Sequence, residues 1–200
     1  LSVNGKEFMI NGMNWDYFPI GTNFNYSLWK QPDDFIKVAL DAEMGLLKNM
    51  GVNTIRVYTG IPPKWITYIY KNYGIYTMLN HAFGRYGLTL DGAWTPNTEY
   101  SDAKTRELLL KEVKDMVQAL DKSHPIAICN GDLLFLDLIK EECKDIDILG
   151  VNMYRGISFG DAFDRVKKEI NKPILFTEFG SDAFNEIEKA EDQKSQAQFD

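Results

Sequence analysis

The sequence has few of the residues that ligate metals or form disulfides. Two cysteines, Cys129 and Cys143, and two histidines, His81 and His124, occur among its 200 residues. None stands at the spacing of a zinc or redox motif, and no glycine-rich phosphate-binding motif follows a predicted strand. We therefore expect free thiols, no metal site and no cofactor.

Basic residues and long apolar runs are also scarce. Lys and Arg total 22 against 29 Asp and Glu, a net charge of −7. Negative charge disfavours nucleic acids and anionic membranes as partners. No apolar run approaches the roughly 20 residues that span a bilayer. The chain opens on Leu1 and has no signal peptide, so we expect a mature product or a fragment. The expected location is secreted or periplasmic.

Short apolar runs alternate with amphipathic helices along the chain. We predict a hairpin and first strand within 6–20, and further strands at 52–58, 75–80, 125–130, 146–153 and 173–177. Helices are predicted at 33–50, 62–72, 101–120, 133–144 and 161–170, with a polar helix from Ala183 onward and a long loop over 82–100. Strands that are apolar on both faces are typical of parallel sheets covered by helices. The prediction is a single α/β domain over residues 1–200.

Polar side chains recur where the predicted parallel strands end. They are Asn14, Arg56, Asn80, His81, Asn130, Asn152, Tyr154 and Glu178. The carboxyl ends of strands carry the ligand site both in (β/α) barrels and in open doubly wound sheets. These residues are therefore the candidates for binding and catalysis.

The strongest local motif is a buried strand that ends in a carboxylate. Residues 173–177 lead into Glu178, and Gly180 then permits a sharp turn. The segment resembles the strand-seven nucleophile motif of retaining barrel glycosidases, among them glycoside hydrolase family 2. The resemblance implies that Glu178 attacks the anomeric carbon and forms a glycosyl-enzyme. A glutamate that only ends a strand is the simpler alternative.

Other segments extend the resemblance from Phe8 to about Ala183. Residues 51–58 resemble strand two, which implies that Arg56 orients the nucleophile and keeps it ionised; a surface ion pair is the alternative. Residues 150–154 resemble strand six, which implies that Tyr154 touches the nucleophile, with packing at the rim as the alternative. Residues 11–15 resemble strand one, where Trp15 either stacks on a sugar or packs above the barrel. The predicted substrate-binding residues are Asn14, Trp15, Asn80, His81, Asn130 and Asn152.

Two strands of the family pattern are missing. The family places its acid/base carboxylate at the end of strand four, roughly 5–5.5 Å from the nucleophile, yet the helix at 101–120 runs straight into 121–125. Glu99 in the long loop is an alternative acid. No eighth strand follows the last helix, and 200 residues fall short of the roughly 250 of a complete barrel.

We therefore predict a TIM-type (β/α) barrel that lacks strands four and eight, in a truncated or internally deleted chain. A compact six-stranded barrel and a fourth strand within 88–94 are alternatives. The expected activity is retaining hydrolysis of O-glycosidic bonds in a β-linked glycan, impaired by the missing acid/base. A β-glucanosyltransferase, which residues 53–58 also resemble, and a non-catalytic carbohydrate-binding barrel are the other hypotheses.

Overall fold

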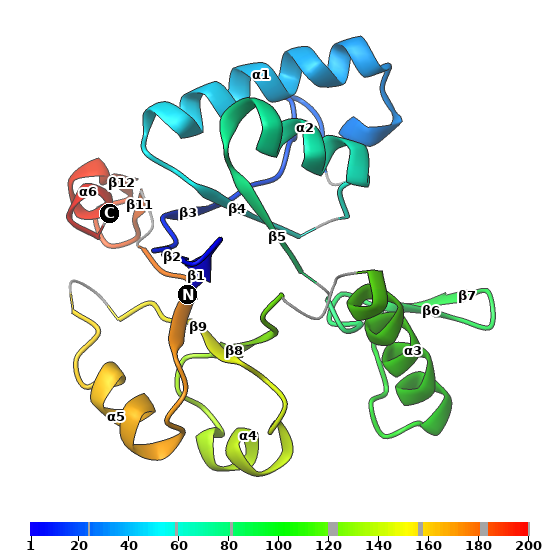
Figure 1. The fold of residues 1–200 in the computed structure, drawn as a ribbon, viewed down its shortest axis with the longest axis vertical. Helices are drawn as coiled ribbons and strands as arrows, with labels where there is room; N and C mark the ends of the chain where they lie inside the picture. Colours follow the sequence, from blue (N-terminus) through cyan, green and yellow to red (C-terminus); the bar gives the residue numbers. More distant parts are fainter. Residues whose placement is uncertain are drawn as a thin grey trace. The chain divides into compact units, whose positions relative to one another are not determined.

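The chain folds as two compact units, residues 1–116 and 117–200 (Figure 1). The structure is a computed structural model that describes residues 1–23, 25–58, 60–80, 82–119, 124–155, 158–180 and 184–199, with the side chains of 113–119 and 199 outside the description. His81, predicted to bind substrate, therefore lies outside the described residues, as do Leu120 and Ala183. Among the described residues, no helix has the length and apolar character needed to cross a membrane.

The first unit contains a three-stranded parallel sheet with helices on one face. The strand order is β3 (Gly12–Asn14), β4 (Thr54–Val57) and β5 (Tyr76–Leu79), and the helices are α1 (Asp33–Asn49) and α2 (Pro63–Tyr73). The predicted apolar face of α1 is confirmed, because Ile36, Leu40, Met44 and Leu47 are all buried in one core with Ile55 and Val57 of β4. The other face of β4 therefore presents Thr54 and Arg56.

Glycines end both helices of this unit as predicted. Gly74 follows α2 with φ +70° and donates its N–H to the Tyr70 carbonyl, and Gly51 has φ +84° after α1. This left-handed conformation is favoured by glycine and closes the last helical turn. The sequence pattern thus predicts the boundaries of α1 and α2 to within about one residue.

Two hairpins differ from the sequence prediction. The first joins β1 (Ser2–Val3) to β2 (Lys6–Glu7) and begins four residues earlier than expected, and the second joins β6 (Leu88–Leu90) to β7 (Ala93–Thr95) inside the predicted long loop. In the first turn, Asn4 has φ +51° and Gly5 has φ +74°; in the second, Asp91 has φ +51° and Gly92 has φ +80°. Positive φ at both residues is typical of two-residue hairpin turns. Because β6 pairs antiparallel with β7 in a two-stranded sheet, the alternative of a parallel fourth barrel strand at 88–94 is wrong.

Helix α3 (Ala103–Ala119) begins two residues later than predicted. The sequence predicts Ser101 as its capping residue, but the structure has Asp102 in this place, because the Asp102 carboxylate accepts the Thr105 N–H at 2.8 Å. Ser101 instead donates both its N–H and its hydroxyl to Glu99, at 3.0 and 2.6 Å. Both residues are good caps, so the sequence alone does not separate them.

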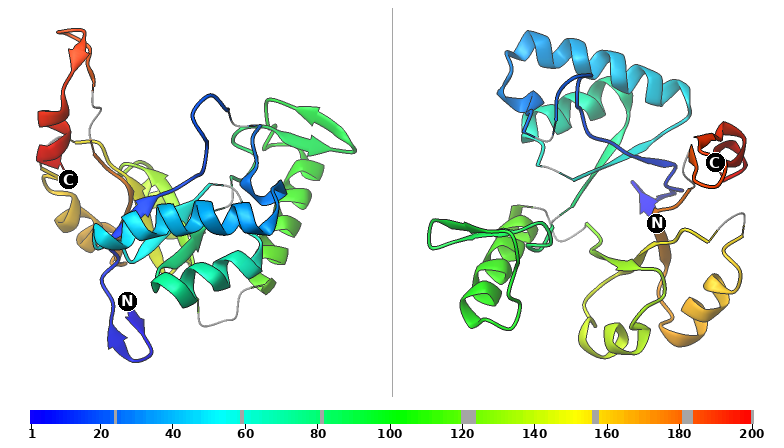
Figure 2. Two further views of the ribbon diagram at one scale, coloured as in Figure 1. Left: turned by 90° about the horizontal axis from the view of Figure 1, so that it is seen from above. Right: turned by 180° about the vertical axis from the view of Figure 1, so that it is seen from behind.

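The second unit repeats the arrangement of three parallel strands with helices on one face (Figures 1 and 2). Its strand order is β10 (Ile174–Glu178), β9 (Ile148–Asn152) and β8 (Ala127–Gly131), and its helices are α4 (Leu136–Glu142) and α5 (Ala162–Glu169). The core is formed by Leu149, Val151 and Met153 with apolar residues of both helices. Helix α4 starts three residues later than predicted, because Asp132 and Phe135 have φ of +51° and +56°, which a right-handed helix excludes.

The six predicted parallel strands are therefore present as two sheets of three. Within the described residues, hydrogen bonds join β3 to β4 and β5, and separately β8 to β9 and β10. Closure of such strands into a (β/α) barrel stays a prediction.

The C-terminal segment is not the continuous polar helix predicted from Ala183. It contains a hairpin, β11 (Phe184–Asn185) with β12 (Ala190–Glu191), followed by the short helix α6 (Gln193–Phe199). The Asn185 amide oxygen accepts the N–H groups of Ile187 and Glu188 at 3.0 and 3.1 Å. Such side-chain bonds offer the backbone an alternative to the helix, and Asn185 therefore favours a turn here.

One buried hydroxyl in β5 leads to a stability prediction. The Thr77 Oγ1 atom is buried and has no hydrogen-bond partner among the described residues. An unsatisfied buried hydroxyl costs about 1–3 kcal/mol. We expect Thr77→Val, which keeps the shape and removes the hydroxyl, to raise the free energy of unfolding by about 1 kcal/mol in urea denaturation. Thr77→Ser, which keeps the hydroxyl and removes a methyl, should lower it; a valine variant no more stable than wild type contradicts the prediction.

Candidate active site

Glu178 and Tyr154 meet at the carboxyl edge of the second unit's sheet. Glu178 is the last residue of β10, and Tyr154 follows the neighbouring strand β9 by two residues. The Tyr154 hydroxyl donates a hydrogen bond to Glu178 Oε2 at 3.0 Å. Tyr154 is 63% exposed, so the pair faces solvent and not the core. The structure thus brings together the carboxylate and the tyrosine that the sequence singles out.

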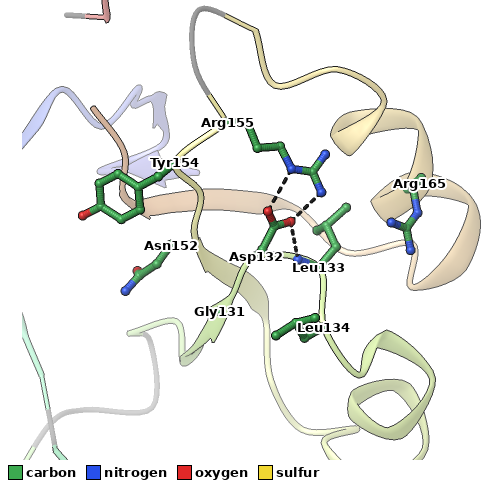
Figure 3. Close-up of a pocket in the computed structure, with 8 residues that line it drawn as sticks. All are labelled: Gly131, Asp132, Leu133, Leu134, Asn152, Tyr154, Arg155 and Arg165. Carbon is green, nitrogen blue, oxygen red and sulfur yellow. Dashed lines mark hydrogen bonds and ion pairs between the residues drawn. The ribbon is translucent and has the colours of Figure 1, made fainter. Parts of the chain in front are cut away.

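An open cavity lies beside this pair, at the ends of β8 and β9 (Figure 3). Its volume is about 560 Å³, within the roughly 300–1,000 Å³ of small-molecule sites. It is lined by Gly131, Asp132, Leu133, Leu134, Asn152, Tyr154, Arg155 and Arg165. Figure 3 shows Tyr154 and Asn152 extending to the same side, away from the Asp132–Arg155 pair. The predicted binding residue Asn152 therefore lies next to Tyr154 in this cavity.

The Asp132–Arg155 pair holds the two loops that form the cavity. Arg155 Nε and Nη2 donate to the two Asp132 oxygens at 2.9 and 2.5 Å, and Arg155 Nη1 donates to the Phe159 carbonyl at 3.3 Å. The Arg155 guanidinium, together with the Leu133 N–H, lowers the pKa of the Asp132 carboxyl below its usual value. Sequence reasoning missed this pair, although Asp132 follows a strand end and Arg155 follows Tyr154.

This ion pair predicts a component of stability that disappears in acid. A carboxyl whose pKa is lowered by folding stabilises the protein above its unfolded pKa of about 4, and that stability is lost as pH falls through the folded value. We expect Arg155→Gln to lower the free energy of unfolding by about 1 kcal/mol at pH 7, a figure discounted because Asp132 is 37% exposed. The difference should shrink below pH 4 in urea denaturation. Arg165→Gln, which breaks a pair with Glu169 within α5 and leaves both hydrogen bonds from Arg155 to Asp132 in place, serves as control with an expected effect of a few tenths of a kcal/mol; equal effects would contradict the assignment.

Asn130, predicted to bind substrate, is a turn residue in the structure. Its side-chain amide donates to the backbone carbonyls of Asp132 and Leu134 at 3.1 and 2.6 Å. Both donor hydrogens of the amide are therefore used to hold the connection from β8 to α4. These two bonds give Asn130 a structural role in the turn, and its role as a sugar ligand stays a prediction.

Three predicted residues of the first unit converge at the carboxyl ends of neighbouring strands. Arg56 donates to the amide oxygens of Asn14 and Asn80 at 3.4 and 3.2 Å and to the Tyr58 hydroxyl at 3.0 Å. Its guanidinium carbon also lies 4.7 Å from the centre of the Tyr58 ring. Arg56 is only 8% exposed, so the alternative of a surface ion pair is wrong. The structure gives Asn14 and Asn80 a shared partner in Arg56.

Trp15 is a core residue. It is 6% exposed, lies in the cluster formed with α1 and α2, and its ring centre is 6.4 Å from that of Trp29. Its indole N–H donates to Glu43 Oε2 at 3.3 Å. The ring is therefore buried in the first unit, and its polar end has a partner there. The structure favours the packing role for Trp15, and its role as a sugar platform stays a prediction.

Glu99 is unsuited to donate a proton at neutral pH. Its carboxylate accepts the hydroxyl and the backbone N–H of Ser101, and these two hydrogen bonds lower the pKa of Glu99 below its usual value. A general acid needs the opposite shift, because it must carry its proton near pH 7.

Within the part of the chain that the structure describes, no group of three or more His, Cys, Asp or Glu side chains could hold a metal ion.

No model of a known protein family and no curated protein matches this sequence. The fold is similar to that of a β-D-glucuronidase from Dictyoglomus thermophilum, with a TM-score of 0.56 and 18% identity over 81% of this chain. A β-glucuronidase from Ruminococcus gnavus is similar with a TM-score of 0.50 and 17% identity over 82% of this chain. The chain spans 36% of the length of each of these two proteins. At these identities the likeness is one of fold, and it extends over most of the chain.

Proposed function

We propose that the protein is a glycoside hydrolase that acts on β-linked glycans with retention, and that Glu178 is its nucleophile. The observation that carries the proposal is the hydrogen bond of 3.0 Å from Tyr154 to Glu178, at the carboxyl edge of a parallel sheet and beside an open cavity. The fold likeness to two β-glucuronidases supports the same class of protein. Closure of the strands into an incomplete (β/α) barrel belongs to this proposal.

The chemistry begins with the Glu178 carboxylate. One oxygen attacks the anomeric carbon as the bond to the leaving group breaks, which gives a covalent glycosyl-enzyme. The Tyr154 hydroxyl donates a hydrogen bond to Glu178 Oε2. This bond orients the carboxylate and stabilises it again when water releases the sugar. In the same proposal Arg56 has the role implied by the resemblance, orienting the nucleophile and keeping it ionised.

The leaving group decides which substrates react. The hydrogen bonds from Ser101 lower the pKa of Glu99, the opposite of the shift that a general acid needs, so no residue is assigned as the general acid. General acid catalysis contributes about 10²- to 10⁴-fold. Aryl glycosides with good leaving groups are therefore expected to react, and unactivated glycans to react slower by that factor.

The test is intact-protein mass spectrometry after incubation with 2-fluoro-glycosides that carry an activated leaving group. The panel includes a 2-fluoro-glucuronide, because both similar structures are named as β-glucuronidases. We expect a mass increase of one fluorosugar, mapped by peptide sequencing to Glu178. Labelling at another residue, or none with any sugar on folded protein, overturns the proposal. An added acceptor sugar separates hydrolysis from transfer, because a transglycosylase returns a longer glycan.

The engagement of Glu99 by Ser101 also favours a second candidate, a carbohydrate-binding protein that has lost turnover. This candidate predicts measurable affinity for a sugar in calorimetry without product formation. Affinity that is unchanged by Glu178→Gln, together with no covalent labelling, would support it over the enzyme.

A further inference from the structure

Regular alternation along β10 points Glu178 away from Tyr154. Ile174 and Phe176 pack against the core under α4 and α5, and side chains two residues apart on a strand share a face. Glu178 would therefore face the same core if the strand continued regularly. Its hydrogen bond with Tyr154, a residue 63% exposed, shows that the alternation is broken.

The break is a β-bulge at Thr177 and Glu178. Phe176 pairs with Val151 and Glu178 pairs with Asn152, so two residues of β10 oppose a single residue of β9. The pairing resumes beyond the bulge, where the Met153 N–H donates to the Glu178 carbonyl at 2.8 Å. Bulges bend a strand and redirect the side chain that follows, and here the redirected side chain is the proposed nucleophile.

A small polar cluster ties the bulge to the other two strands. The Thr177 hydroxyl donates to Asn152 Oδ1 at 2.7 Å, and Cys129 Sγ lies 3.2 Å from both of those oxygens. Thr177 is 8% exposed, so its hydroxyl bond is shielded from water. The cluster joins β8, β9 and β10 at the level of the bulge.

The backbone of β9 leaves room for this arrangement. A Cβ atom built on Gly150 would lie 2.5 Å from the Ile128 carbonyl oxygen and 3.0 Å from Thr177 Cγ2. Real Cβ atoms do not approach a backbone oxygen that closely, so any larger residue at 150 would have to shift the neighbouring strand or Thr177. The close packing around Gly150 therefore fixes where the Thr177 side chain lies.

We propose that Thr177 is a positioning residue, whose hydroxyl bond to Asn152 holds the bulge that turns Glu178 toward Tyr154. The inference rests on the proposed function for its catalytic consequence. Whether Thr177 holds the register of β10 does not depend on that function.

The test compares Thr177→Val with Thr177→Ser. Valine keeps the shape and loses the hydroxyl, while serine keeps the hydroxyl. Asn152 still accepts the Cys129 thiol in the valine variant, so we expect it to fold; Thr177→Ala is a second variant without the hydroxyl should valine prevent folding. Circular dichroism and the unfolding midpoint establish which variants are folded.

The kinetic readout is the rate of trapping by the 2-fluoro-glycoside that labels wild type. Misplacement of a reacting group by about 1 Å costs on the order of 100-fold. We expect the first-order trapping constant to fall by about that factor in the valine variant, with the half-saturation concentration within about twofold of wild type. The serine variant should stay within about threefold, because its hydroxyl restores the bond.

The structural readout is a crystal structure of each variant. We expect the serine variant to keep Glu178 opposite Asn152, and the valine or alanine variant to lose the Tyr154–Glu178 hydrogen bond. Valine-variant trapping at the wild-type rate with the bulge intact overturns the inference. If wild type is never labelled, the proposed function fails, and the register in the crystal structures still decides whether Thr177 holds the bulge.

Discussion

Replacement of Glu178 by glutamine is expected to lower turnover of an activated aryl β-glycoside by at least about a thousandfold. Removal of a covalent nucleophile is among the largest single losses in catalysis, about 10⁶-fold in a well-studied serine enzyme. Glutamine keeps the size of the side chain and can still accept the Tyr154 hydroxyl hydrogen that Glu178 accepts at 3.0 Å. The loss is therefore expected in turnover, with the unfolding midpoint close to that of wild type.

The matched control is Glu186→Gln, which changes a glutamate of the same unit that forms an exposed pair with Lys189 and does not line the cavity. Its turnover should stay within about twofold of wild type, because a surface pair is worth only a few tenths of a kcal/mol.

A sharper test uses Glu178→Gly with added azide. The small anion can enter the space of the lost carboxylate and attack the anomeric carbon, and the product should be an α-glycosyl azide. Wild-type turnover by Glu178→Gln would remove Glu178 from the mechanism.

The sequence predicts the repeating part of this fold because burial is periodic there. The alternation of short apolar runs with amphipathic segments predicts the six parallel strands and the helices α1, α2 and α5, and the structure has them within a few residues. Parallel neighbouring strands bring the ends of β9 and β10 to one edge, but the contact of Tyr154 with Glu178 was implied by the family resemblance, and it depends on the bulge in β10. Asn4-Gly5 and Asp91-Gly92 are dipeptides typical of two-residue hairpin turns. The second hairpin was nevertheless not predicted, because a long loop was expected over 82–100.

The bulge and the polar contacts could not be predicted in this way. A bulge places two residues of one strand opposite a single residue of the next and requires no particular residue type. The apolar pattern of residues 173–178 would therefore be the same with or without the bulge. The Asp132–Arg155 pair joins residues 23 apart, and the sequence contains no signal for which aspartate meets which arginine. The same is true of Asn130, whose amide donates to two backbone carbonyls in a turn where Asp132 and Phe135 have left-handed φ angles.

Trp15→Ala is expected to lower the free energy of unfolding by about 3–5 kcal/mol, the usual cost of truncating a buried large aromatic. Trp15 is 6% exposed and belongs to the core formed with Leu40, Met44 and Trp65. Alanine leaves a cavity among these side chains and also leaves Glu43 without the indole donor that it accepts at 3.3 Å. Urea denaturation measures the loss, and Phe18→Ala, at a nearby aromatic that is 44% exposed, is the control with an expected change within about 1 kcal/mol.

Trp15→Phe then separates packing from sugar recognition. Phenylalanine keeps an aromatic ring in the core and loses the hydrogen bond to Glu43, which is worth about 1–2 kcal/mol. If Trp15 acts only in packing, this variant is less stable by that amount and traps 2-fluoro-glycosides with an unchanged half-saturation concentration. A platform that stacks on the sugar would instead raise the half-saturation concentration with little change in stability. Because the indole is enclosed by α1, α2 and Trp29, the first result is the one that the structure predicts.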